Sequence, residues 1–186
     1  PFYNRATQGV YPPGSVFKLI TAAAALEYYP DALTRTYTCK GELPVGETVI
    51  TDANGEVHGK LDLKRAFAVS CNNTFATIGM DLGADKLKAE AEKFGFNNNF
   101  LFGDLLLYSS SYRSPTKKSD LGWSAVGQYK DLVTPLHMCM ITAAVANDGV
   151  MMEPKLLKHL VNVRGYDYQE LKPAEYGRPL SAKNAK

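Results

Sequence analysis

Apolar residues follow one another almost without interruption in two stretches of the chain, and this pattern predicts two buried helices. The first stretch covers residues 16–29 and contains no glycine or proline before Pro30. It leaves no wide polar face, which is typical of a helix covered on all sides. The second stretch covers residues 136–147 and follows Thr134-Pro135, the residue types of an N-cap and a first helical position.

Shorter periodic segments predict smaller elements between and after these helices. They are strands at 34–39 and 47–51, helices at 61–69, 74–82 and 84–94, and a strand-like run at 155–163. Ala53-Asn54-Gly55 is typical of a hairpin turn. Residues 97–119 follow no regular pattern, and a loop of this length usually has a function or is mobile.

These elements predict an α+β fold that is mostly helical and includes a small β-hairpin. With 186 residues, of which 45% are hydrophobic, the chain can fill the core of one domain. We expect the domain to span residues 1–164, with 165–186 as a polar tail or a connection to further structure. Because the chain begins at Pro1 and carries no signal peptide, we interpret it as a piece of a longer protein.

Charge and cysteine content exclude several classes of function. The formal net charge of +2 gives no indication of a nucleic-acid partner. There is no apolar run long enough to span a membrane. The three cysteines, Cys39, Cys71 and Cys139, are too few and too scattered to predict a disulfide framework or a zinc site. The histidines stand apart, so we expect neither a metal nor a cofactor.

Ser15 and Lys18 form a Ser-x-x-Lys motif directly before the first buried helix. Positions three apart share one face of a helix, so the hydroxyl and the amine are expected within reach of each other. A plain structural interpretation makes Ser15 an N-cap and Lys18 a solvated lysine. A lysine in the first turn of a buried helix is costly unless it is paired or neutral, and this favours a base.

A second motif, Ser70-x-Asn72, lies between two predicted helices, where a loop can hold a hydroxyl and an amide over a site. Serine and asparagine are also ordinary residues of helix breaks, so the tripeptide has meaning only together with the first motif.

With both motifs in place, the sequence resembles the transpeptidase domain of penicillin-binding proteins, closest to the class B members. The resemblance rests on five segments: Asn4-Arg5-Ala6 through Lys18, Thr21 to Glu27, Ser70-Cys71-Asn72, Gly127-Gln128 with Val133-Thr134-Pro135-Leu136, and Ala146-Asn147-Asp148-Gly149-Val150. It implies the mostly helical part of the fold shared with serine β-lactamases, with an incomplete central sheet. The family's third motif, Lys-[Ser/Thr]-Gly, occurs nowhere in the 186 residues.

The resemblance implies a D,D-transpeptidase that crosslinks peptidoglycan and is the target of β-lactams. Ser15 would attack a peptide ending in D-Ala-D-Ala, with Lys18 as base and Ser70 as proton relay. Asn72, Gly127 and Gln128 would bind the substrate. Other cell-wall synthesis proteins would be partners of the full-length form.

Three alternatives remain at this point: a transpeptidase fragment, a penicillin-sensing module, and a non-catalytic interaction domain. Sensor domains usually carry an apolar residue where Asn72 stands, so Asn72 favours the transpeptidase. The family also implies a place on the extracytoplasmic face of the bacterial membrane, with the anchor outside this chain. Without the third motif we expect the isolated chain to be inactive.

Overall fold

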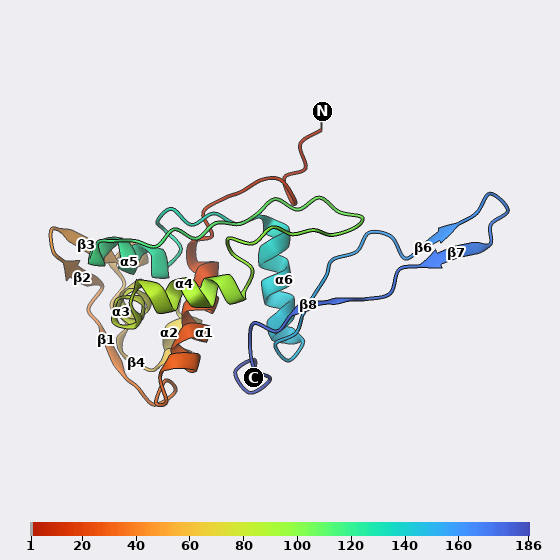
Figure 1. Ribbon diagram of the computed structural model, residues 1–186. Helices are drawn as coiled ribbons and strands as arrows, with labels where there is room; N and C mark the ends of the chain where they lie inside the picture. Colours follow the sequence, from red (N-terminus) through yellow and green to blue (C-terminus); the bar gives the residue numbers. More distant parts are fainter. Residues whose placement is uncertain (1) are drawn as a thin grey trace.

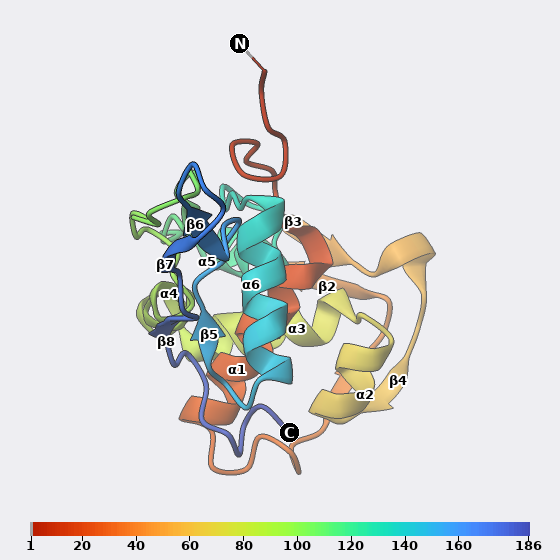
Figure 2. The same ribbon diagram turned by 90° about the vertical axis from the view of Figure 1, so that its right-hand side faces the viewer.

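Helices α1 (Lys18–Tyr28) and α3 (Asn72–Leu82) pack against each other at the centre of the protein (Figure 1). Helix α4 (Ala84–Lys93) contacts both, and α5 (Lys118–Ala125) packs on α3. Helix α6 (Pro135–Ala146) runs beside this group (Figure 2). The structure is a computed structural model that describes residues 2–186.

The strands form two-stranded antiparallel sheets, and within residues 2–186 none of these sheets joins another. The pairs are β1 (Tyr37–Cys39) with β4 (Gly59–Leu61), β2 (Glu42–Val45) with β3 (Thr48–Thr51), β5 (Met151–Met152) with β8 (Glu175–Gly177), and β6 (His159–Val161) with β7 (Asp167–Glu170). A short helix, α2 (Leu63–Ala68), follows β4. The predicted α+β class with a small hairpin is therefore confirmed.

Phe17 anchors the start of α1 in the core. Its ring meets the edge of the Phe96 ring at a centroid distance of 5.6 Å and stacks on Tyr112 at 5.8 Å. Phe17 and Phe96 are fully buried. Aromatic pairs of this kind stabilise a fold beyond what the burial of their apolar area contributes. The turn that precedes α1 is therefore held in a fixed position.

His137 fastens the long irregular segment to α6. Its Nε2–H donates to the backbone oxygen of Phe94 at 2.8 Å, and its Nδ1 accepts from the Ser110 hydroxyl at 2.7 Å. Burial lowers the pKa of His137 to about 4, so the ring is neutral at physiological pH. This histidine has a structural role.

The helices predicted from the apolar pattern are present, with ends shifted by no more than two residues. The hairpin turn predicted at residues 53–55 was wrong, because these residues form the short 3-10 helix η2 (Ala53–Gly55), and the hairpin β2–β3 turns at residues 46–47 instead. The first strand is shorter than predicted, since residues 31–35 form a turn.

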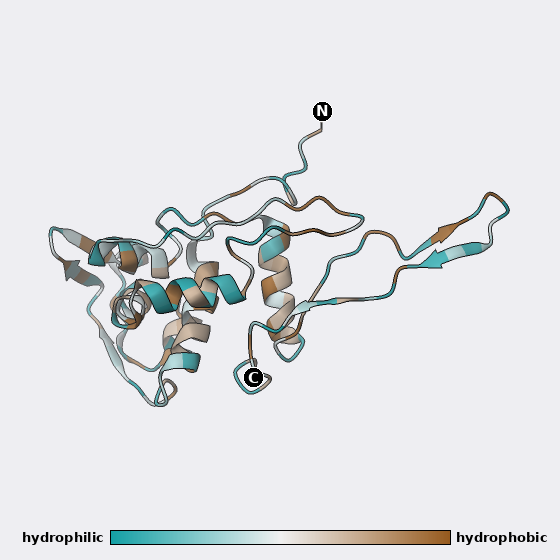
Figure 3. Ribbon diagram, viewed as in Figure 1, coloured by the Kyte–Doolittle hydropathy of each residue, from teal (hydrophilic) through white to brown (hydrophobic). Residues whose placement is uncertain are grey.

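Residues 165–186 contain strands that the polar composition of this segment did not predict. Strand β8 pairs with β5, and Leu180 is buried against the backbone of Gly149. The β6–β7 hairpin projects from the body, with apolar β6 beside polar β7 (Figures 1 and 3). All residues of these two strands are exposed.

Within residues 2–186, no helix is both long enough and apolar enough to cross a bilayer.

Candidate active site

The amine of Lys18 lies at the meeting point of both sequence motifs. Its Nζ is 3.3 Å from Ser15 Oγ, 2.9 Å from Ser70 Oγ, 2.5 Å from the Ser70 backbone oxygen and 2.7 Å from Asn72 Oδ1. Lys18 is only 1% exposed, whereas the hydroxyl-bearing residues Ser15 and Ser70 are exposed. A buried amine thus faces two hydroxyls that are open to solvent.

The plain interpretation of the sequence made Ser15 a helix N-cap, but Ser15 does not occupy that position. It lies inside a 3-10 turn, η1 (Gly14–Phe17), which continues directly into α1 at Lys18. Side chains three positions apart eclipse one another in a 3-10 helix, and this brings the Ser15 hydroxyl over the Lys18 amine. The buried Phe17 between them fixes which side of the turn faces the core.

Ser70 occupies a backbone conformation that normally selects glycine. Its φ angle is +55°, in the left-handed region, directly after the end of α2. The Ser70 N–H donates to the Phe67 oxygen at 3.1 Å and the Cys71 N–H to the Ala66 oxygen at 2.9 Å, the hydrogen bonds of a Schellman helix end. A serine here costs free energy that glycine would not. The turn aims both Ser70 oxygens at Lys18.

Asn72 is oriented from two sides. Its Nδ2 donates to the Thr51 backbone oxygen at 2.9 Å, so Oδ1 points toward Lys18. The Asp52 carboxylate accepts the backbone N–H of Asn72 through Oδ1 and that of Asn73 through Oδ2, the latter at 3.4 Å. A carboxylate at a helix N-terminus is favoured by unsatisfied N–H groups and by the helix dipole. Asp52 therefore holds the start of α3 against the loop after β3, a role that the sequence did not reveal.

The four oxygens around Lys18 fit a neutral amine. The Ser70 carbonyl and Asn72 Oδ1 can only accept, and a neutral amine has two N–H groups to donate to them. The lone pair of the neutral amine can then accept a proton from the hydroxyl of Ser15 or of Ser70. Burial lowers the pKa of Lys18 from 10.5 to about 8, although the negative charge of Asp52 opposes this shift.

Gly127 and Gln128 lie against Gly14, the first residue of the η1 turn that carries Ser15. The Gly14 N–H donates to the Gly127 oxygen at 2.9 Å. The φ angle of Gly127 is +75°, and a Cβ there would come within 2.1 Å of the Gly14 oxygen, so only glycine fits. Gln128 is exposed, and its side-chain amide lies beside Gly14.

Comparison with known families identifies the chain. The family model of the penicillin-binding protein transpeptidase domain matches residues 1–186. This chain belongs to that family.

The transpeptidase domain is similar to several curated proteins and solved structures. It is 37% identical over 164 residues to the peptidoglycan D,D-transpeptidase PbpA of Mycolicibacterium smegmatis, covering 86% of this chain and 33% of the relative. Identity to the D,D-transpeptidase MrdA of Escherichia coli is 30% over 172 residues, covering 84% of this chain and 27% of MrdA. The chain therefore spans a third or less of the length of these relatives.

Solved structures confirm the fold. The ceftriaxone acyl-enzyme complex of penicillin-binding protein A from M. tuberculosis superposes with a TM-score of 0.93 at 30% identity. That match covers 100% of this chain and 42% of the other. The D,D-transpeptidase domain of a peptidoglycan glycosyltransferase from Eggerthella lenta gives a TM-score of 0.90 at 31% identity, covering 98% of this chain and 48% of the other. The predicted transpeptidase fold is thus confirmed.

Two of the three cysteines, which are widely separated in the sequence, lie close together in the fold. In the transpeptidase domain Cys39 and Cys71 come together with Asp52 and His58, although they lie far apart in sequence. Pairing of β1 with β4 brings Cys39 and His58 to one end of this two-stranded sheet, and α2 returns the chain to it. Cys139 lies elsewhere and is exposed.

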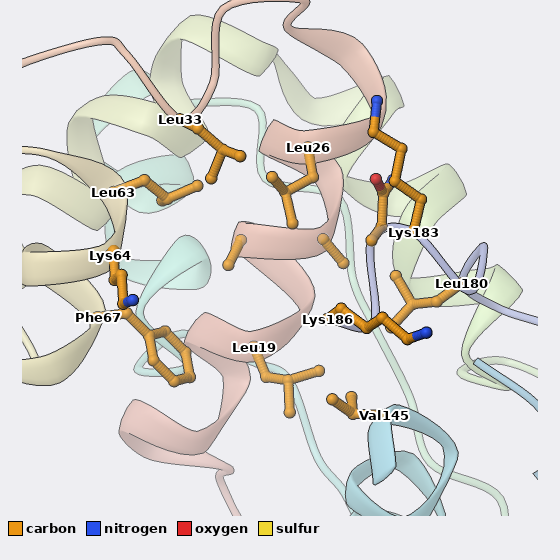
Figure 4. A pocket seen from close by; sticks show the side chains of 13 residues that line it. Leu19, Leu26, Leu33, Leu63, Lys64, Phe67, Val145, Leu180, Lys183 and Lys186 are labelled. Carbon is orange, nitrogen blue, oxygen red and sulfur yellow. The ribbon is translucent and has the colours of Figure 1, made fainter. Parts of the chain in front are cut away.

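An apolar hollow of about 480 Å³ runs along α1, on the surface shown in Figure 4. Its lining includes Leu19 and Leu26 of α1, Leu63 and Phe67 of α2, Val145 of α6, and Leu180. None of Ser15, Lys18, Ser70 and Asn72 lines it. The residues of the two sequence motifs therefore lie outside this hollow.

Replacing Ser70 with glycine or with alanine should separate backbone strain from the loss of the hydroxyl. Both variants lose the contact of Oγ with Lys18, but only glycine relieves the left-handed backbone. We expect Ser70→Gly to be more stable than Ser70→Ala by about 1 kcal/mol in the free energy of unfolding. Denaturant unfolding measures this difference, and equal stabilities would contradict the strain at position 70.

The amine of Lys18 should titrate well below the ordinary lysine range. We expect a midpoint near pH 8, set by burial, in an NMR titration of protein with isotope-labelled lysine side chains. The spectrum of a Lys18→Gln variant assigns the signal. Since the unfolded chain binds more protons between the folded and unfolded pKa values, this lysine should make the fold more stable as pH rises from 8 toward 10.5. A midpoint above pH 10 would overturn the neutral-amine interpretation.

Proposed function

We propose that this chain carries the nucleophile and the general base of a serine D,D-transpeptidase. The observation that supports the proposal most directly is the position of Lys18 Nζ. It donates hydrogen bonds to the Ser70 backbone oxygen and Asn72 Oδ1, and it lies 3.3 Å from Ser15 Oγ. A serine hydroxyl is a weak nucleophile until a nearby base takes its proton. A buried amine with a lowered pKa supplies such a base at mildly alkaline pH.

In the proposed reaction Ser15 Oγ attacks the carbonyl carbon of the peptide bond while its proton passes to Lys18. The proton then travels through Ser70 Oγ, 2.9 Å from the amine, to the leaving amino group. The acyl group remains on Ser15 until the amine of a second peptide attacks it. That step forms the crosslink and regenerates the serine.

The backbone supplies part of the oxyanion site. The Ser15 N–H lies at the start of η1, where a helix leaves its first donors without internal partners. It can therefore donate to the oxygen that becomes negative in the transition state. One such donor is typically worth about 3–4 kcal/mol. The close contact between Gly127 and Gly14 keeps this turn in place, so Gly127 acts by positioning.

Asn72 has a double role in this proposal. Its Oδ1 orients the lysine amine, and one N–H of its amide donates to Thr51. The second N–H is available to a substrate amide group. The exposed Gln128 amide beside Gly14 is placed to contact the peptide as well.

The names of the relatives support a proposal for the substrate and the location. Curated relatives are named peptidoglycan D,D-transpeptidases, and similar structures are acyl-enzyme complexes with ceftriaxone and penicillin G. We infer that the protein acts on stem peptides ending in D-Ala-D-Ala, is acylated by β-lactams on Ser15, and works with other cell-wall synthesis proteins. Because such substrates lie outside the cytoplasm, we also propose that the full-length protein is membrane-anchored and works on the extracytoplasmic face of the membrane.

The nucleophile can be tested with a fluorescent penicillin on a form of the protein that contains these residues and a Lys-Thr-Gly segment. Ser15→Ala should lower the rate of labelling by at least about 10³-fold, because the attacking oxygen is gone. Lys18→Met should lower it by roughly 10²–10⁴-fold through loss of the base.

The control for this experiment is Ser114→Ala, which removes an exposed hydroxyl that belongs to neither motif and does not contact Lys18, and it should leave labelling unchanged. Retained labelling of Ser15→Ala would contradict the assignment. Labelling of the parent protein without any turnover of a D-Ala-D-Ala peptide would favour a penicillin sensor over a transpeptidase.

The 186 residues alone should react slowly with the same probe. They contain no Lys-[Ser/Thr]-Gly, whose strand carries a second oxyanion donor in this family. We expect labelling to be about 10²–10³-fold slower than in the form that includes this segment, the usual effect of one missing donor. Rapid stoichiometric labelling of the 186 residues would show that the site is already complete.

A further inference from the structure

Three buried polar side chains lie beside the aromatic rings that anchor the η1 turn, and the proposed reaction uses none of them. They are Tyr112, Ser124 in the last turn of α5, and Asp131. Ser124 and Asp131 are fully buried, and Tyr112 is 3% exposed. The ring of Tyr112 stacks on Phe17, which belongs to the η1 turn. A change at these groups can therefore reach the turn that carries Ser15.

A hydrogen bond between Ser124 and Asp131 closes the loop that connects them. The Ser124 hydroxyl donates to Asp131 Oδ2 at 3.0 Å. The loop between these residues contains Gly127, whose backbone oxygen accepts the Gly14 N–H at 2.9 Å. The Ser124–Asp131 bond thus holds in place the segment that contacts the first residue of η1.

The chain that follows Asp131 is paired on both sides. Leu132 exchanges backbone hydrogen bonds with Ser111 at 2.8 and 2.9 Å. Val133 does the same with Tyr11 at 3.0 and 2.9 Å, and η1 begins three residues after Tyr11. Asp131 is therefore connected to the η1 turn in two ways, through the loop before it and through the pairing after it.

The Asp131 carboxyl has few partners for a buried acid. Within residues 2–186, Oδ1 forms no hydrogen bond, and none of the ion pairs includes Asp131. An ionised carboxyl is costly in such a place, because it lacks the water and the cations that stabilise its charge. Burial accordingly raises the pKa of Asp131 to about 7, although the Ser124 hydroxyl and the backbone N–H of Arg113 oppose this shift.

Tyr112 is the titratable neighbour of this carboxyl. Burial raises the pKa of the Tyr112 hydroxyl, the Ser124 hydroxyl opposes the shift, and a charge on Asp131 adds to it. The tyrosine therefore stays neutral while Asp131 titrates. Lys130, next to Asp131 in the chain, is exposed, and its amine lies over the ring of Tyr129 at 5.4 Å.

We propose that Asp131 is a positioning residue for Ser15, which as a neutral acid keeps residues 124–131 closed against the η1 turn and on ionisation loosens them. The neutral acid keeps its hydrogen bond and leaves no charge in the core. An ionised carboxyl gains stabilisation from water when the loop opens, and opening frees the Gly14 N–H. The proton passes to solvent, and no covalent bond to carbon changes. The effect on the reaction rests on the proposed function, whereas the effect on the loop does not.

The direction of the pH effect follows from the raised pKa of Asp131. In the open loop the carboxyl has its ordinary pKa of 3.8, so opening releases a proton between this pH and about 7. Opening should therefore become easier as the pH rises toward 7, and the effect should level off above it. Asparagine at this position has no proton to release, and the trend should disappear.

Hydrogen exchange of the Gly14 amide tests the loop in the form of the protein that contains a Lys-Thr-Gly segment. The Gly165 amide, bonded to Asn162 at the hairpin of β6 and β7, is the internal reference, because hydroxide accelerates both exchange rates alike. We expect the ratio of the Gly14 rate to the Gly165 rate to rise by at least about 10-fold from about pH 5 to pH 7. Asp131→Asn should hold this ratio constant. Asp85→Asn, the matched control at an exposed carboxyl, should follow the parent.

Labelling with the fluorescent penicillin measures the effect on Ser15. Asp131→Ala leaves the Ser124 hydroxyl without its acceptor, and the displaced η1 turn should lower the maximal rate of acylation by about 10-fold. The half-saturating concentration of the penicillin should change little. Asp131→Asn still offers an oxygen to Ser124 and should restore most of the parent rate. A role in stability alone would lower the thermal midpoint of Asp131→Ala and leave the rate of its folded fraction unchanged.

Three results would overturn the inference. One is a ratio of Gly14 to Gly165 exchange that does not change with pH in the parent protein, a measurement that requires no variant. Another is the same pH trend in Asp131→Asn, which would assign it to a different group. The third is Asp131→Ala that folds and is acylated at the parent rate. Labelling of Ser15→Ala would instead contradict the proposed function, and the exchange ratio would still decide the role of Asp131 in the loop.

Discussion

The burial of a single amine governs the structure of this protein. Lys18 is 1% exposed, and a buried amine without partners would cost several kilocalories per mole. The fold offsets this cost with oxygens from Ser15 and from the Ser70–Asn72 loop. These groups come from two segments more than fifty residues apart, so the amine is satisfied only when α1 and α3 pack together. The same contacts that stabilise Lys18 place it beside two hydroxyls, and fold and chemistry therefore depend on one arrangement.

The second motif is held in a conformation that its own sequence does not favour. Ser70 has a left-handed backbone, and such residues persist only where the surroundings hold them. Here the helix-end hydrogen bonds act from one side and Asp52, at the N-terminus of α3, from the other. Asp52 Oδ2 also lies 3.1 Å from Cys39 Sγ and 3.6 Å from Cys71 Sγ, so Asp52 itself is held between β1 and the start of α3. The region between β1 and β4 thereby supports the Ser70–Asn72 loop through Thr51 and Asp52.

Apolar packing and reactive groups are separated in this domain. The face of α1 that carries Leu19 and Leu26 lines an apolar hollow (Figure 4). The Lys18 amine instead points toward the hydroxyls of Ser15 and Ser70. A well-formed apolar hollow is often the first choice for an active site. In this domain the two sequence motifs lie elsewhere, because none of Ser15, Lys18, Ser70 and Asn72 lines the hollow. The position of Lys18 is therefore the better indicator of function.

Local sequence determined the helices and the first contact of the site. Unbroken apolar periodicity gave α1 and α6 to within two residues, and a spacing of three brought Ser15 and Lys18 together, because both depend on residues a single turn apart. Tertiary structure alone decided the approach of Ser70 to Lys18, the cap formed by Asp52, the gathering of Cys39 with Cys71, and the strands within residues 165–186. Each of these joins segments distant in sequence, and such contacts depend on how whole elements pack, which a local pattern does not encode.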